Sequence, residues 1–134
     1  MSHSATETSD AELLRAFEAL ELPAAELTHR AHVRLAFVML QDADFGDAAV
    51  RYRRALRRFA DSVGAAGKYH ETLTWAYLAV VHERMHASPC ATSFELLEHN
   101  PDLLDHQRAL AGYYDLAAIT ASPLARRVFV LPRP

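Results

Sequence analysis

The chain has 134 residues, 51% of them hydrophobic and only 4 of them glycine, and its formal net charge at pH 7 is −3. This length suits one domain with a hydrophobic core, and the single cysteine, Cys90, cannot form an internal disulfide. The charge excludes a global field that would recruit nucleic acid or an anionic membrane, and no apolar run is long enough to span a bilayer. We therefore expect a cytoplasmic protein.

Polar residues occupy positions 1–8, and we expect them to be a disordered segment ahead of a single domain over 9–134. Ser9 followed by Glu12 is a capping box, which predicts a helix over about 10–21 that Pro23 ends. Further cap and stop signals predict helices at about 29–42, 46–62, 68–87, 93–99 and 101–114, with a short last helix from Ser122-Pro123 to Phe129. The predicted fold is therefore all-α, a single-domain bundle of about six helices.

Histidines fall on the apolar face of two of these helices. Successive helical residues turn by about 100°, so on the helix over 68–87 His70 shares a face with Leu73, Tyr77 and Val81. The opposite, more polar arc of that helix carries Thr72, Trp75, His82, Glu83 and His86.

The same calculation on the helix over 29–42 places His29 and His32, three residues apart, toward the apolar face. Arg30 and Arg34 fall on the far arc, which we expect to face solvent. If that helix begins earlier, at Pro23, Glu26 joins the two histidines on one line.

A buried imidazole without a partner costs about 1–3 kcal/mol, and one divalent ion satisfies several imidazoles at once. We therefore predict that His29, His32 and His70 hold one divalent transition metal: zinc, copper, iron or nickel. Three protein ligands would leave positions open, as in catalytic sites; Glu26, Glu71 or water would be the fourth ligand. Glu71 would otherwise act as the acid–base group, and Lys68 and Tyr69 would hold a substrate anion at the helix start.

The leading functional hypothesis is thus a metal-dependent enzyme acting on a small polar molecule, with oxidative and hydrolytic chemistry both open. Two alternatives stay open beside it. One is a non-catalytic carrier or sensor of a metal or ligand. The other is an interaction module in which the buried histidines only pair with carboxylates or carbonyls.

The string His82-Glu83-Arg84-Met85-His86 matches the zinc-hydrolase pattern His-Glu-x-x-His. Its histidines lie on the polar arc, and they are about 18 Å along the helix from His70, so they cannot share its metal. We expect a helix-terminal pair of histidines there rather than a hydrolase centre.

Five arginines stand between Arg51 and Arg58. Aspartates flank this run and no aromatic side chain interleaves with its basic face, so a solvated helix is favoured over a nucleic-acid site. Trp75 and Val38 lie on otherwise polar arcs, which would suit a homodimer contact.

The chain resembles a family of small uncharacterised bacterial all-α proteins in four segments: Thr28-His29-x-x-His32-Val33, Lys68-Tyr69-His70-Glu71-Thr72-Leu73-Thr74, Tyr113-Tyr114 and Ala125-Arg126. The resemblance covers most of the chain from about residue 26. It implies a bacterial all-α protein and no particular activity.

Overall fold

The structure is a computed structural model that describes residues 7–133, and the all-α prediction is confirmed over that range. The disordered segment predicted for 1–8 lies almost wholly outside the described residues. Within the described residues, the bundle contains more elements than the six helices predicted. Eight α-helices and three short 3-10 helices follow in the order α1 (Asp10–Glu18), η2 (Ala24–Glu26), α2 (His29–Asp42), α3 (Phe45–Ser62), η3 (Ala66–Lys68), α4 (Glu71–Ala87), α5 (Ser93–His99), η4 (Pro101–Leu104), α6 (His106–Leu110), α7 (Leu116–Ala121) and α8 (Pro123–Arg127).

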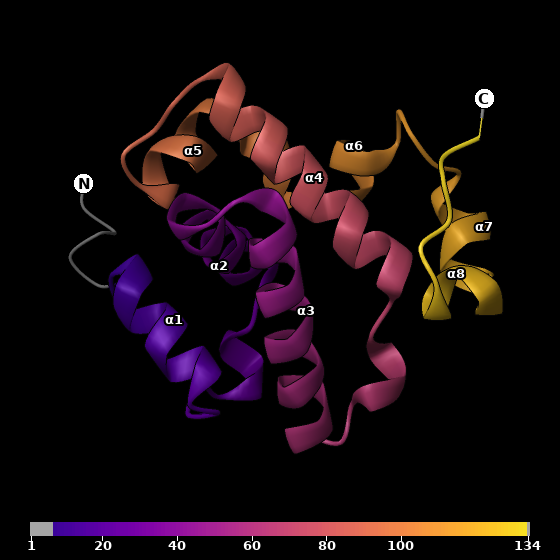
Figure 1. The fold of residues 1–134 in the computed structure, drawn as a ribbon, viewed down its shortest axis with the longest axis horizontal. Helices are drawn as coiled ribbons and strands as arrows, with labels where there is room; N and C mark the ends of the chain where they lie inside the picture. Colours follow the sequence, from indigo (N-terminus) through magenta and orange to yellow (C-terminus); the bar gives the residue numbers. More distant parts are fainter. Residues whose placement is uncertain (1–6, 134) are drawn as a thin grey trace.

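Helix α2 is the centre of the bundle (Figure 1). It packs against α1, α3, α4 and α5, and its buried side chains point in all directions around the helix axis. Helices α6 and α8 pack against α4 on the side away from α1. None of the helices within residues 7–133 has the length and apolar character that crossing a membrane requires.

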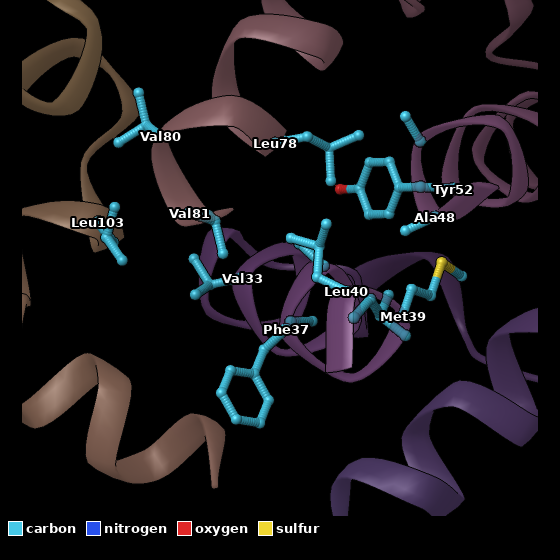
Figure 2. Close-up of a cluster of buried hydrophobic side chains, with 14 of the residues drawn as sticks. Val33, Phe37, Met39, Leu40, Ala48, Tyr52, Leu78, Val80, Val81 and Leu103 are labelled. Carbon is cyan, nitrogen blue, oxygen red and sulfur yellow. The ribbon is translucent and has the colours of Figure 1, made fainter. Parts of the chain in front are cut away.

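The hydrophobic core forms where α2, α3 and α4 meet (Figure 2). Val33 and Phe37 of α2 are almost completely buried, as are Leu78 and Val81 of α4. Each such side chain contributes about 1.5–3 kcal/mol relative to an exposed position, so this contact holds the two helices at a fixed spacing. The core therefore also fixes the spacing between the start of α2, which carries His29 and His32, and the start of α4, which follows His70.

Side-chain caps start α1 and α2 where the sequence predicts them. Ser9 Oγ accepts a hydrogen bond from the Glu12 amide at 3.1 Å, and Thr28 Oγ1 accepts one from the Ala31 amide at 3.2 Å. The helix predicted over 101–114 is wrong, because Asp105 Oδ1 accepts the Gln107 amide at 3.0 Å and so starts a new helix. The segment is divided into η4 and α6, and α7 follows from a further cap.

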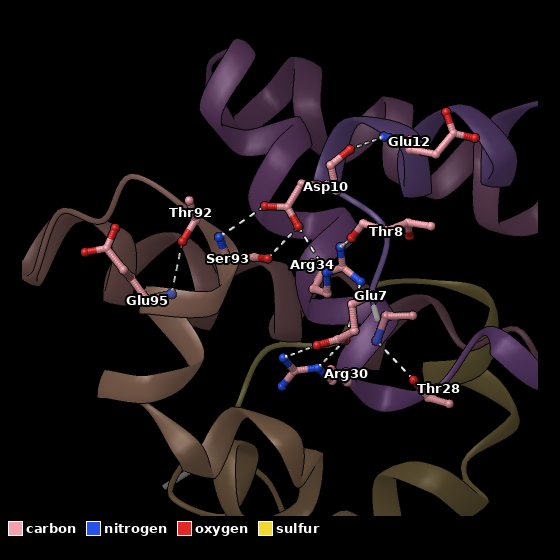
Figure 3. Close-up of polar contacts among 12 residues, drawn as sticks. Glu7, Thr8, Asp10, Glu12, Thr28, Arg30, Arg34, Thr92, Ser93 and Glu95 are labelled. Carbon is pink, nitrogen blue, oxygen red and sulfur yellow. Dashed lines mark hydrogen bonds and ion pairs between the residues drawn. The ribbon is translucent and has the colours of Figure 1, made fainter. Parts of the chain in front are cut away.

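Arg34 is buried, with only 4% of its surface exposed, which corrects the expectation that it faces solvent. Its Nε donates to Asp10 Oδ1 at 3.0 Å, and its guanidinium also donates to the Thr8 carbonyl (Figure 3). Asp10 in turn accepts from the Ser93 hydroxyl at 2.5 Å and from the Ser93 amide at 3.1 Å. This network, which we call the Arg34 network, joins α1, α2 and α5.

Thr72 is completely buried, although the helical angles place it on the polar arc. Its hydroxyl lies 2.8 Å from the Ala125 carbonyl and 2.9 Å from the Val128 carbonyl, and it accepts from the Val130 amide at 3.0 Å. The C-terminal segment covers this side of α4, a long-range contact that periodicity cannot predict.

Trp75 and Val38 also pack against the core, and the Trp75 ring lies 6.3 Å from that of Phe45. They therefore give no support to the homodimer, which stays a prediction.

Candidate functional site: a pocket lined by four histidines

A cavity of about 580 Å³ lies between η2, α2, α3, α4 and α6, and all three histidines proposed as ligands line it. The fourth histidine on its wall, His106, comes from the start of α6. We call this cavity the histidine pocket. Its polar lining also includes three tyrosines, Lys68 and Thr74, and its apolar wall is formed by Leu27, Leu56, Phe59, Val63, Leu73 and Leu110.

His70 does not have a ring nitrogen available for a metal. The helix predicted from residue 68 begins at Glu71, and His70 is its N-cap in an extended conformation. Its Nδ1 accepts the Leu73 amide at 3.2 Å, and its Nε2 lies 2.9 Å from the Ile119 carbonyl oxygen, to which it must donate. The ring is therefore neutral and fully hydrogen-bonded, which is a structural role that joins α4 to α7.

His29, His32 and His106 instead gather at one side of the pocket. The His29 and His106 rings are 4.9 Å apart between centroids, and the His29 and His32 rings are 6.5 Å apart. The i, i+3 spacing on α2 thus brings two imidazoles to the same cavity, as the sequence predicts. The partner that joins them is His106 and not His70.

The three-histidine metal centre is not supported by this arrangement. Within residues 7–133, no three side chains of the metal-binding types are grouped closely enough to hold one ion. Glu26, considered as a further ligand, is exposed on η2 and does not line the pocket. Metal binding therefore stays a prediction.

His32 is held by one hydrogen bond, between its Nδ1 and the Tyr52 hydroxyl, at 2.9 Å. Burial raises the pKa of Tyr52 well above its ordinary value, so the hydroxyl keeps its proton. Tyr52 is 3% exposed and has no other hydrogen-bond partner among the described residues, so its proton is best placed on His32 Nδ1. His32 Nε2 then carries the ring hydrogen.

His32 also lines the pocket. Its Nε2 makes no hydrogen bond within residues 7–133 and is not fully buried. Burial, with repulsion from His29 and His106, lowers the pKa of His32 to about 4. At neutral pH the pocket therefore contains an uncharged imidazole that presents one N–H donor.

The residues proposed for catalysis do not all reach the pocket. Lys68 and Tyr69 line it, but Glu71 does not. The Glu71 carboxylate accepts from Arg53 Nε at 2.9 Å and from the Tyr69 hydroxyl at 2.7 Å. Burial works to raise the pKa of Glu71, but the hydrogen bonds from Tyr69 and Arg53 outweigh it and hold the pKa below its ordinary value. Glu71 is a fixed anion of an ion pair, and the acid–base role assigned to it does not fit this geometry.

The His-Glu-x-x-His string forms a local pair only. His82 and His86 lie side by side on α4, with 3.2 Å between their Nε2 atoms, and His82 packs on Phe45 at 5.2 Å between ring centroids. Neither residue lines the histidine pocket, and the described residues offer no third ligand nearby.

Two members of the site were not assigned to it from the sequence. Tyr52 lies on the buried face of α3, but nothing in the spacing links it to His32 of α2. His106 follows the Asp105 cap, and no periodicity indicates that it meets α2. No protein-family model, curated protein or solved structure matches this chain, so the chemistry of the pocket follows from its own side chains.

Proposed function

We propose that the protein is an enzyme that binds a small polar molecule in the histidine pocket and uses neutral His32 to polarise an oxygen atom of that molecule. The observation that carries the proposal is the His32–Tyr52 pair, because it presents a neutral imidazole N–H to a cavity of about 580 Å³. The volume is within the range of about 300–1,000 Å³ that is common for sites of small molecules.

A neutral imidazole is a suitable group for stabilising negative charge that develops on a carbonyl oxygen. Its N–H donates a hydrogen bond without the cost of burying a positively charged imidazolium. The low dielectric constant of the interior strengthens this hydrogen bond. The Tyr52 hydroxyl holds the ring orientation, so the donor is in place before the ligand arrives. His29 and His106, with ring centroids 4.9 Å apart and planes tilted by 33°, would be the groups that exchange a proton with the ligand in the same step.

Binding in the pocket is tested by placing a large side chain at an exposed position of its wall. Ala24 and Ala25 are adjacent exposed residues of η2, and only Ala24 lines the pocket. In a fragment screen by ligand-observed NMR, we expect fragments that bind the wild type to lose binding in Ala24→Trp and to keep it in Ala25→Trp. Equal binding to both variants would overturn the assignment of the pocket, as would the absence of any fragment with a Kd below about 1 mM.

The role of His32 is tested with the fragments that pass this screen. Each is followed by NMR for chemical conversion, with the wild type beside His32→Phe, which keeps the ring and removes the nitrogen atoms. We expect conversion to fall by about 100-fold or more while binding weakens by much less, as for the loss of one donor to a developing oxyanion. Binding without any conversion in the wild type would instead favour the ligand-carrier alternative.

The transition-metal prediction is tested with untagged protein. The geometry leads us to expect less than about a tenth of an equivalent of zinc, copper, iron or nickel after reconstitution. Stoichiometric uptake that His29→Ala abolishes and His86→Ala does not would restore the metal-dependent enzyme as the better proposal.

A further inference from the structure

The wall of the histidine pocket carries ionisable side chains but no carboxylate. The wall has four histidines, three tyrosines and Lys68, but no aspartate or glutamate. Glu71, close by in sequence to Lys68, is held outside by Arg53 at 2.9 Å. The pocket thus has groups that donate hydrogen bonds or carry positive charge, and it lacks the carboxylate that a cationic ligand would need.

Lys68 is the one lysine on this wall. It is exposed at the end of η3, and among residues 7–133 it takes part in no ion pair. Two arginines close to Lys68 already have partners: Arg53 forms an ion pair with Glu71, and Arg126 donates a hydrogen bond to the Gly67 carbonyl at 2.9 Å. A lysine left without a partner at the edge of a carboxylate-free cavity is a group that an anionic ligand would satisfy.

We propose that the ligand of the histidine pocket is an oxyanion, a carboxylate or a phosphate, carried on an apolar body. The oxyanion would contact His32 Nε2, His29 and His106 and attract Lys68, and the body would lie on Leu56, Phe59 and Leu73. This inference rests on the proposed function, because it names the class of molecule that the same pocket takes.

Such a ligand couples its binding to proton uptake. Burial and repulsion from His29 lower the pKa of His106, while Asp105 works in the opposite direction. A bound anion offsets the repulsion and favours the imidazolium form, so its affinity increases as the pH falls from 8 to 6. The other titratable side chains on the wall of the pocket are His32, His70, Tyr52, Tyr69, Tyr77 and Lys68, and none of them is a carboxylate.

The experiment compares four probes with one bicyclic body by isothermal titration calorimetry on the full chain: 2-naphthoate, 2-naphthyl phosphate, neutral 2-naphthamide and cationic 2-naphthylmethylamine. We expect at least one anion to bind about tenfold or more tightly than the amide, and the amine to bind weakest. The tighter of the two anions identifies the oxyanion. Titrations at pH 7 in two buffers of different ionisation enthalpy measure the protons taken up on binding. We expect proton uptake when the anion binds and none when the amide binds.

Two variants keep the result specific. Lys68→Met and His106→Gln should each reduce the preference for the anion over the amide. Arg54→Met removes the same charge as Lys68→Met from an exposed site that does not line the pocket, and it should change nothing. Equal affinity for amide and anion, tightest binding of the amine, or no binding of any probe at millimolar concentration would overturn the inference. The fragment screen with Ala24→Trp decides the proposed function separately.

Discussion

Arg34 and His32 lie two residues apart on α2, and each brings polar atoms into the interior, but their surroundings differ. The Arg34 guanidinium meets Asp10, the Thr8 carbonyl and the face of Phe94, 4.8 Å from the ring centroid. Among residues 7–133, His32 has one hydrogen-bond partner, Tyr52, and it lines a cavity. A buried polar group that has all its hydrogen-bond partners stabilises the fold. A polar group that lacks a partner and lies beside a cavity is a candidate for binding a ligand.

The largest expected effect comes from breaking the Arg34 network. Arg34→Met should lower the free energy of unfolding by about 3–5 kcal/mol, because it leaves the partly buried Asp10 carboxylate without its cation. Urea denaturation followed by circular dichroism measures this loss. Arg30→Met is the matched control: this side chain is 31% exposed in its pair with Glu7, and its loss should cost about 1 kcal/mol or less. Similar losses in both variants would remove the distinction drawn for Arg34.

His32 should give the protein a specific sensitivity to acid. Its pKa is about 4 in the folded chain, below the ordinary value of 6.5, so between pH 6.5 and pH 4 the unfolded chain binds a proton that the folded chain does not. The stability contributed by neutral His32 is present above pH 6.5 and is lost as the pH falls toward 4, by on the order of 3 kcal/mol in total.

The measurement is the free energy of unfolding against pH for the wild type and His32→Phe. The carboxylates and remaining histidines titrate in both proteins, so the difference between the two curves isolates His32. We expect the wild type to lose more stability than the variant between pH 7 and pH 4. Parallel curves would show that His32 is solvated in the folded state.

The smallest effect sharpens the contrast between His70 and His32. His70→Ala removes both the cap on Leu73 and the hydrogen bond to Ile119, and it should cost about 1–2 kcal/mol of stability. His70→Asn retains a cap acceptor and should recover about half of this loss. Thermal unfolding of the three proteins measures the series. If Asn were no better than Ala, the capping role of His70 would be wrong.

The sequence predicts the helical class, most helix boundaries and several of the caps, among them Ser9 and Thr28, because these depend on residues a few positions apart. It also brings His29 and His32 to one cavity through their spacing on α2. The assignment of His70 as a metal ligand is not supported by its hydrogen bonds, because the helix begins three residues later than predicted and His70 is its N-cap. His106, Tyr52 and the burial of Arg34 and Thr72 depend on contacts between distant segments, and the period of a single helix contains no information on these.

The hydroxyl of Thr72 fastens the chain at Ala125, Val128 and Val130, and His70, two residues earlier, fastens it at Ile119. Detaching the segment that follows α7 would therefore leave the Thr72 hydroxyl and the backbone groups that it bonds without partners. We expect this part of the molecule to open as a single cooperative unit in hydrogen exchange.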